Sequence, residues 1–116
     1  MSKFYLKTSS GQYMFNLTGD NGEIILTSEL YVTKTGAENG IASVRANAPY
    51  DSRYQRKQGT GYQPYTFVLK AENGEIIGRS ENYSSETARE VGIASVKKNA
   101  PKAPVVDQTA AQKSYY

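Results

Sequence analysis

Apolar residues occupy every second position in one stretch near the start of the chain. Tyr13, Phe15 and Leu17 alternate with other residues, and this period of two predicts a strand with these side chains facing the core. The same pattern predicts that Asn16 and Thr18 face outward. One face of the strand is therefore expected to pack against another layer of structure.

Two further strands are predicted on either side, FYLK at residues 4–7 and EIILTS at residues 23–28. Ser9-Ser10-Gly11 predicts the turn before the alternating strand. Asn21-Gly22 predicts the turn after it, because Asn and Gly both tolerate the positive φ angles that tight hairpins require. The first third of the chain is therefore expected to form a three-stranded meander.

The spacing of apolar residues then changes to that of a helix. Thr33 is the predicted N-cap, and Asn47 suits a left-handed position at the C-terminus, just before Pro49. One face of this helix is apolar. It carries Ala37, Ile41, Val44 and Ala48. The meander and the helix each present one apolar face, so we expect the helix to cover the sheet.

The whole pattern occurs twice. GIASVRANAP at residues 40–49 returns as GIASVKKNAP at residues 92–101, and an ungapped alignment at this offset keeps 21 of 37 residues identical between 13–49 and 65–101. The second copy predicts a first strand at residues 54–57, an N-cap at Ser85 and a left-handed Asn99. The chain is therefore an internal duplication.

A single copy of about 50 residues has too little core to be stable alone, so the copies are expected to share one. The predicted fold class is α+β: two tandem strand-strand-strand-helix repeats related by a pseudo-two-fold, with antiparallel sheets each covered by one helix. Repeat 1 spans residues 1–49 and repeat 2 spans 50–107, with a closing strand near 104–107 and a flexible tail at 108–116. The pattern leaves open whether the repeats form one sheet or two, and whether they exchange strands through residues 50–57.

Two residues of each repeat are expected to serve packing. Gly40 and Gly92 lie inside the predicted helices, where glycine costs about 1 kcal/mol relative to alanine, so their recurrence indicates a close approach to the helix. Tyr31 and Tyr83 follow a Ser-Glu pair in the segment before each helix, and we expect each ring to pack over the helix start. Residues that are identical in both copies are therefore expected to have structural roles.

The repeated motifs NGEII-x-x-SE-x-Y and GIASV-(K/R)-x-NAP resemble those of the YegP-like family of small bacterial proteins. The resemblance extends from Phe4 to about Asp107. It implies an α+β fold of duplicated, strand-rich, single-helix units, and single-copy relatives imply that the duplicated form imitates a dimer. It implies no activity, cofactor or catalytic residue. The second copy differs from the first at its glycine-rich turn, residues 59–61, and at Pro64. These differences leave the register of the first hairpin of repeat 2 open.

Composition narrows the possible chemistry. The chain has no cysteine, histidine or tryptophan, which excludes disulfides, thiolate and imidazole catalysis and Cys- or His-based zinc sites. We expect no metal or cofactor and no enzymatic activity. No apolar run reaches the roughly 18 residues of a membrane span, and the start lacks the apolar core of a secretory signal, so the expected location is the cytoplasm.

Residues 50–65 carry the strongest binding signal. The net charge is +3, and this stretch interleaves tyrosines with basic residues, a combination that can stack bases and neutralise phosphates. Tyr54 and Tyr65 align with the inward Phe4 and Tyr13, which removes them from the candidate surface. The candidate contacts for a nucleic acid or a partner are Tyr50, Arg53, Arg56, Lys57, Tyr62, Lys97, Lys98 and Lys102.

The favoured function is a small non-enzymatic binding or interaction module, with an unidentified protein partner or a second copy as its ligand. The alternative is a weak, electrostatic nucleic-acid binder that uses residues 50–65. An enzyme that uses carboxylates such as Glu23 and Glu75 ranks third. A duplicated fold needs its structural residues in both copies, but it usually needs a functional residue only once. Functional residues are therefore expected where the copies differ in sequence or where they meet in space.

Overall fold

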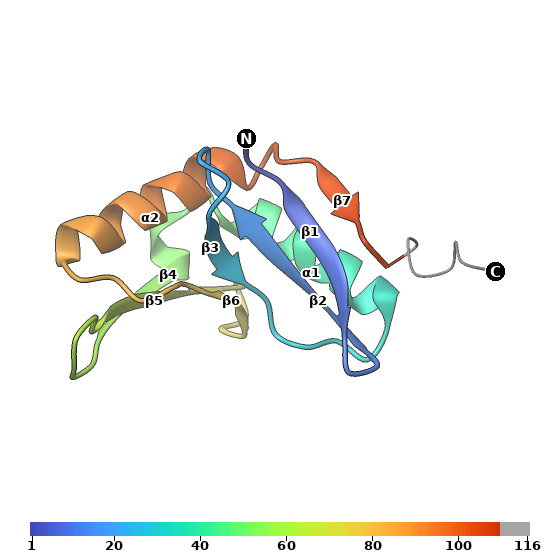
Figure 1. Cartoon of the computed structure of the whole chain (residues 1–116), viewed down its shortest axis with the longest axis horizontal. Helices are drawn as coiled ribbons and strands as arrows, with labels where there is room; N and C mark the ends of the chain where they lie inside the picture. The colour runs from blue at the N-terminus through green and yellow to red at the C-terminus, as the bar shows by residue number, and fades with distance from the viewer. Residues whose placement is uncertain (110–116) are drawn as a thin grey trace.

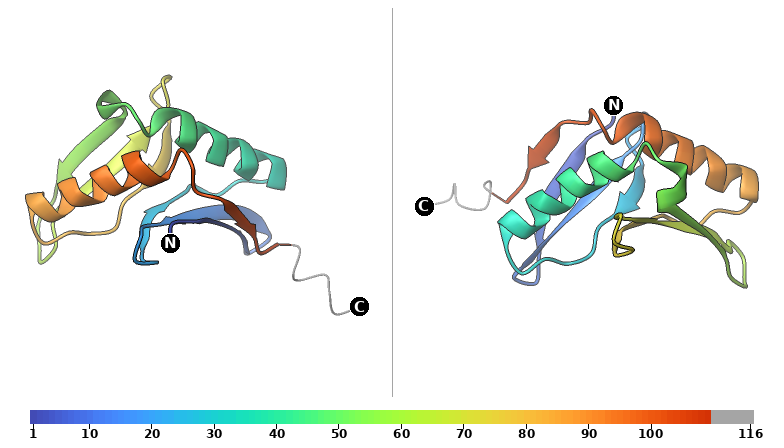
Figure 2. Two further views of the ribbon diagram at one scale, coloured as in Figure 1. Left: turned by 90° about the horizontal axis from the view of Figure 1, so that it is seen from above. Right: turned by 180° about the vertical axis from the view of Figure 1, so that it is seen from behind.

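Seven strands form one sheet, and two helices cover one of its faces (Figures 1 and 2). This arrangement comes from a computed structural model that describes residues 1–109. The elements in chain order are β1 (Phe4–Ser9), β2 (Gln12–Thr18), β3 (Ile24–Thr27), α1 (Lys34–Asn47), a short 3-10 helix (Asp51–Arg53), β4 (Tyr54–Gln58), β5 (Tyr65–Lys70), β6 (Ile76–Arg79), α2 (Glu86–Asn99) and β7 (Val105–Asp107). The predicted α+β class is confirmed.

The strand order across the sheet is β4-β5-β6-β3-β2-β1-β7, so both repeats belong to a single sheet. β3 and β6 meet as antiparallel neighbours at the junction, through the pair Thr27 and Arg79. From this junction the strands of the two repeats follow in the same sequence toward either edge. Within the described residues each meander keeps its own three strands, and residues 50–57 are not exchanged between repeats.

The two hairpins of repeat 1 use different turns. Ser10 and Gly11 have φ angles of 50° and 82°, and Ser9 pairs with Gln12 across this two-residue turn. At the Asn-Gly turn only Gly22 has a positive φ, of 83°. The expectation of positive φ at both Asn21 and Gly22 is therefore wrong. A four-residue turn bonded from Gly22 N–H to the Gly19 carbonyl (3.1 Å) takes its place, with the glycine in the left-handed position.

The alternating strand faces the core as predicted, with Phe15 and Leu17 fully buried. Asn16 and Thr18, predicted to face outward, alternate with these residues along the strand and are also buried, each 4% exposed. Burial of these two polar side chains is tolerated because both form hydrogen bonds with neighbouring segments. Asn16 Nδ2 donates to Thr27 Oγ1 (2.9 Å), and Thr18 Oγ1 accepts from the backbone N–H of Lys3 (3.0 Å).

Both helices begin at the predicted caps. The side chain of Thr33 accepts a hydrogen bond from Gly36 N–H (2.9 Å), and that of Ser85 accepts one from Ala88 N–H (3.0 Å). The predicted left-handed asparagines at the helix ends are wrong. Asn47 remains helical, because a following turn satisfies its carbonyl through Tyr50 N–H (3.1 Å).

Asn99 departs from the prediction in the same way. Its carbonyl accepts hydrogen bonds from the backbone N–H groups of Lys102 (3.1 Å) and Ala103 (2.9 Å). Its side chain turns back and Nδ2 donates to Ser95 Oγ (3.2 Å). No left-handed residue is then needed to end the helix.

The two repeats share one hydrophobic core, because each helix contacts strands of both. α1 packs on β1 and β2 of its own repeat and on β5 and β6 of the other, whereas α2 packs on β5 and β3. The predicted helix stripe is buried: Ala37, Ile41, Val44 and Ala48 are at most 2% exposed. The question left open by the sequence, one sheet or two, is thus answered by a single sheet with two helices that lie across the junction.

Each helix glycine lies against the tyrosine of its own repeat. A Cβ on Gly92 would overlap the Tyr83 hydroxyl, and a Cβ on Gly40 would overlap the Tyr31 hydroxyl. Each tyrosine ring stacks on a core phenylalanine, with centroids 6.3 Å apart for Tyr31 and Phe15. The close approach expected at these glycines is made by a tyrosine as well as by the sheet.

The C-terminal segment closes the sheet. β7 pairs in parallel with β1, which confirms the predicted closing strand. Lys34 Nζ lies 2.5 Å from Asp107 Oδ2 and ties β7 to the start of α1. Gln108 N–H donates to the Leu6 carbonyl (2.9 Å), and Thr109 is 8% exposed, so ordered contacts continue two residues beyond the strand. The rest of the predicted tail, residues 110–116, lies outside the described residues.

Leu26 and Gly78 meet where the repeats join, although they occupy equivalent positions of the two copies. A Cβ added to Gly78 would lie 2.6 Å from Leu26 Cδ2, which real Cβ atoms do not tolerate. Leu26 itself is fully buried. One repeat therefore supplies a large side chain at this point and the other supplies the space for it.

We expect Gly78→Ala to lower the free energy of unfolding by about 1–3 kcal/mol through overpacking, despite the better strand propensity of alanine. Leu26→Ala alone should cost about 2–5 kcal/mol. In the double variant the cost of Gly78→Ala should largely disappear, because the clashing methyl is gone. Urea unfolding of the four proteins measures this coupling, and strictly additive values would contradict the packing described here.

Candidate functional site

The sequence-predicted surface is separated into small clusters. Tyr50 is 57% exposed, and the guanidinium of Arg53 lies over its ring at 5.5 Å. Arg53 Nε also donates to Asn47 Oδ1 (2.8 Å) at the end of α1. Tyr62, on the loop between β4 and β5, is 92% exposed. The guanidinium of Arg53 is therefore held by neutral partners at the end of α1.

Two of the predicted cations converge on a single carboxylate. Asp51 Oδ1 accepts from Arg56 Nη2 (3.0 Å) and from Lys97 Nζ (2.8 Å). Arg56 Nε also donates to Glu90 Oε2 (2.8 Å) on α2. These hydrogen bonds, first from Arg56 and then from Lys97, lower the pKa of Asp51 to about 2. The positive charge of this cluster is therefore largely neutralised within the protein.

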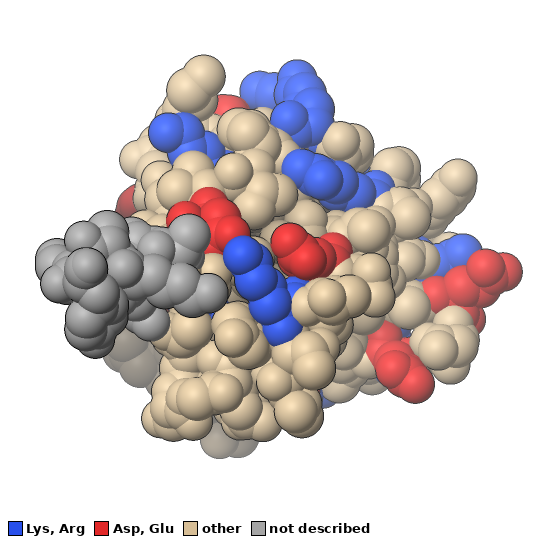
Figure 3. Space-filling view, turned by 90° about the vertical axis from the view of Figure 1, so that its right-hand side faces the viewer, with Lys and Arg blue, Asp and Glu red and all other residues tan. Residues whose placement is uncertain are grey.

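The remaining predicted lysines do not complete a patch. Lys98 Nζ lies 3.3 Å from Asp20 Oδ2, an ion pair that joins α2 to the turn between β2 and β3. Lys57 and Lys102 are exposed on different segments, β4 and the turn after α2. Figure 3 shows the face that carries β7, where Lys and Arg are interspersed with Asp and Glu. The sequence prediction missed the acidic partners, because most of them are distant in the chain.

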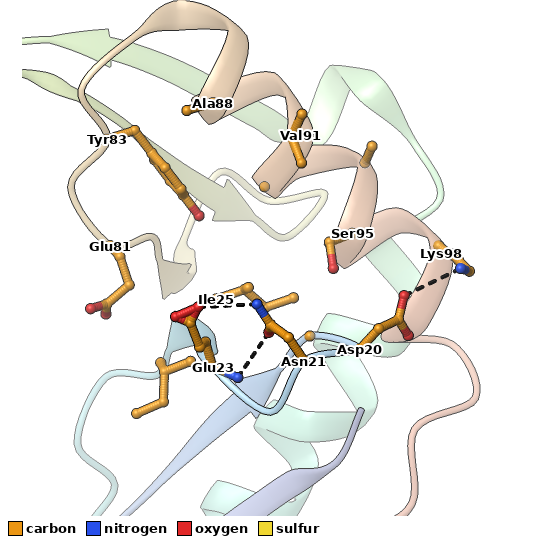
Figure 4. Close-up of a pocket in the computed structure, with 14 residues that line it drawn as sticks. Asp20, Asn21, Glu23, Ile25, Glu81, Tyr83, Ala88, Val91, Ser95 and Lys98 are labelled. Atoms are coloured by element: carbon orange, nitrogen blue, oxygen red, sulfur yellow. Dashed lines mark hydrogen bonds and ion pairs between the residues drawn. The ribbon is translucent and has the colours of Figure 1, made fainter. Parts of the chain in front are cut away.

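A groove of about 880 Å³ lies between the β2–β3 turn and α2, close to the junction of the repeats (Figure 4). Its walls are mostly apolar. They include Ile24, Ile25, Tyr83, Ala88, Val91, Gly92 and Ala94. Val91 is 65% exposed and Ile24 is 39% exposed, so apolar surface of both walls is open to solvent. Exposed apolar surface in a concave site is typical of a binding surface.

One wall is the β2–β3 turn, held close to α2. A Cβ on Gly19 would lie 3.2 Å from Ser95 Oγ, so the absence of a side chain permits this approach. The ion pair between Lys98 and Asp20 lies at the end of the groove (Figure 4). Asn21 Oδ1 accepts the Glu23 N–H (3.0 Å) and orders the turn. The wall is thus a turn of repeat 1 that lies against the helix of repeat 2.

The opposite side contains Tyr83 and Glu81, from the segment that leads into α2. The Tyr83 ring stacks on Phe67 with centroids 6.4 Å apart, and its hydroxyl points to Gly92. Burial, and secondly the charge of Glu81, raise the pKa of the Tyr83 hydroxyl. Tyr83 therefore stays neutral in the physiological range and offers a ring and a hydroxyl rather than an anion.

The chemistry available in the groove is apolar contact with carboxylates at the rim. Glu23 and Glu81 are exposed, and neither forms an ion pair with the residues that the structure describes. Within residues 1–109 no three acidic groups lie close enough together to hold a metal ion. The groove can therefore bury an apolar group and accept hydrogen bonds from a cationic one.

The groove could have been found from the sequence by comparing the two copies. Val91 occupies an exposed position of α2 at which α1 has Asn39. An apolar residue that replaces a polar one on the solvent side of a repeated helix indicates an added role. The sequence of the repeats does not show which segment lies opposite Val91, because that segment, the β2–β3 turn, belongs to the other repeat.

Comparison with known proteins assigns the family. A family model described as a domain of unknown function, DUF1508, matches residues 8–55 and again 63–107. A UPF0339 protein of Bordetella pertussis is 59% identical over 108 residues, which cover 93% of this chain and 96% of that protein. UPF0339 protein YegP of Yersinia pestis is 55% identical over 103 residues, covering 89% of this chain and 91% of the relative.

A solution NMR structure of a UPF0339 protein from Shewanella oneidensis is similar to this fold. Its TM-score is 0.89 at 43% identity, with 99% of this chain and 98% of that chain covered. The chain contains the DUF1508 domain and belongs to the UPF0339 (YegP) family, as the repeated motifs indicated. The family has no assigned function, so the relatives supply the fold and no activity.

Neither helix of the described part of the chain has the length and apolar character needed to cross a bilayer.

The carboxylate cluster at Asp51 predicts a pH dependence of stability. Its pKa lies below the ordinary 3.8, so the stabilisation is present above pH 4 and is lost as the pH falls toward 2. Glu90 has a lowered pKa for the same reason, first through Arg56. We expect Asp51→Asn to flatten the fall in the free energy of unfolding between pH 4 and pH 2, measured by urea titration at several pH values. An equal fall in both proteins would contradict the assignment.

Proposed function

We propose that this protein is a small non-enzymatic binding module, and that the groove between the β2–β3 turn and α2 is its binding site. The observation that carries the proposal is the exposed apolar surface of Val91 and Ile24 on facing walls of a preformed concavity. Burial of such surface by a ligand releases water and favours association, at about 25 cal/mol for each Å². The walls come from both repeats, so the site exists only in the assembled fold.

Ordered contacts support a preformed site. The ion pair of Lys98 with Asp20 and the hydrogen bonds within the β2–β3 turn fix one wall, and the stacked Tyr83 and Phe67 fix the other. A preformed site loses little conformational entropy when a ligand binds. This favours recognition of a partner segment or a small molecule over a purely structural role for the exposed Val91.

Nucleic-acid binding through residues 50–65 has less support. The phosphate contacts that drive such binding need cations that are free to replace counterions. Arg56 and Lys97 are instead shared with Asp51, and Arg56 also with Glu90. An enzymatic function has no specific observation in its favour, since no nucleophile and base are paired in the groove.

Amide NMR titrations discriminate the two binding functions. We expect pooled, capped hexapeptides with apolar cores to shift signals of the groove, at residues 19–25, 83 and 88–95. Single-stranded RNA and DNA dodecamers at low salt should leave residues 50–62 and 102 unchanged. Shifts at residues 50–62 that fade with added salt would instead favour the nucleic-acid function.

Val91→Asp should weaken peptide binding at least tenfold, because it removes the equivalent of about 1.5 kcal/mol of apolar burial and adds a buried charge. Asn39→Asp is the matched control, since residue 39 is exposed at the equivalent position of α1. Both variants should unfold at nearly the same urea concentration as the parent. Equal peptide affinity of the two variants would exclude the groove as the site.

A further inference from the structure

The duplication supplies an internal comparison for the groove. Tyr31 in repeat 1 occupies the position of Tyr83, and its pKa is raised by burial, then by Glu29 and by Glu75. Glu29 and Glu75 are the repeat equivalents of Glu81 and Glu23. Tyr31 is therefore influenced by a glutamate of its own repeat and by one from the turn of the other repeat. On the α2 side, Glu81 and Glu23 line the same groove as Tyr83. Differences between the surroundings of Tyr31 and those of Tyr83 show what is particular to the α2 groove.

The first difference is the charge of the rim. Arg79 Nε donates to Glu29 Oε2 (2.9 Å) and neutralises it on the α1 side. The equivalent of Arg79 is Thr27, which is already occupied as the acceptor from Asn16 Nδ2 (2.9 Å). Glu81 thus has no cation in the place where Glu29 has one. Among residues 1–109, the α2 groove therefore has an unpaired carboxylate, whereas the equivalent carboxylate on the α1 side is paired with Arg79.

The second difference is the apolar wall on α2, where Val91 replaces Asn39. Asp20 is compensated by Lys98, whose equivalent on α1 is Ala46. The rim of the α2 groove therefore carries two uncompensated charges, on Glu23 and Glu81, beside solvent-exposed valine and isoleucine side chains. Glu23 Oε1 accepts a hydrogen bond from the neutral Asn21 Nδ2 (3.0 Å), which leaves its charge uncompensated. An anionic ligand would be repelled there, and a cationic group would be attracted.

We propose that the α2 groove binds a short peptide segment of a partner protein in which an aliphatic or aromatic residue is flanked by Lys or Arg. This inference rests on the proposed function and adds the chemistry of the ligand. The apolar side chain contacts Val91 and Ile24, and the flanking cations contact Glu23 and Glu81. Ion pairs at an exposed rim add little affinity, so their main effect is to select cationic over anionic segments.

The test is a selection of phage-displayed random heptapeptides on the full chain, with counterselection on Val91→Asn, which gives α2 the neutral polar residue that α1 has at this position. We expect the retained pool to be enriched in Lys or Arg beside Val, Ile, Leu or Phe. A retained pool of neutral or acidic apolar peptides would overturn the cation requirement and leave the groove as a binding site. A pool that Val91→Asn also retains in full would overturn the proposed function itself.

Glu81→Gln provides a quantitative check with an enriched peptide made synthetically. We expect its affinity to fall about two- to fivefold, and the difference between variant and parent to vanish at high salt. Glu29→Gln is the matched control in the other repeat and should leave the affinity unchanged. Equal losses in the two variants would contradict selection by the groove.

The peptide-free protein must also be examined across a range of concentrations. Its groove signals should not move on dilution, since the proposed ligand belongs to another protein. If dilution shifts residues 19–25 and 88–95, the groove is occupied by a second copy of this chain, and the proposed partner is wrong.

Discussion

The packing of Leu26 into the space left by Gly78 is the contact on which the remaining structure depends. β3 and β6 share the single ladder pair of Thr27 and Arg79, so side-chain packing has to hold the repeats together at this point. If both copies carried leucine here, the side chains would collide, and if both carried glycine, a void would remain. A large residue from one copy and a small one from the other solve the problem, and the helices then cover the joint.

The groove follows from the same junction. Because β3 lies beside β6, the turn before β3 extends over the other repeat and reaches α2, where Gly19 contacts Ser95. The equivalent surfaces then diverged in sequence. Arg79 compensates Glu29 on one side, whereas Thr27 leaves Glu81 uncompensated on the other. A duplicated framework can keep its packing residues in both copies while one copy of a surface acquires different chemistry.

The sequence predicted features that depend on local chemistry and on the repeat. The caps Thr33 and Ser85, the buried stripe of α1 and the closing strand β7 were all predictable, because each depends on neighbouring residues or on the internal alignment. The carbonyl partners that keep Asn47 helical were not, since a turn beyond the helix supplies them. The acidic partners of Arg56 and Lys98 were not predictable either, because they lie 34 and 78 residues away in the chain.

The parallel pairing of β7 with β1 has a consequence for the order in which the protein can be completed during synthesis. β1 is made before β7, so the outer edge of β1 has no strand beside it until residue 107 has left the ribosome. The hairpin of β1 and β2 can form early, but its exposed edge must wait. The other edge strand, β4, has Arg56 at the position equivalent to Leu6, a charged residue that discourages pairing with other chains. The late-closing edge is thus the one on which aggregation of a nascent chain would begin.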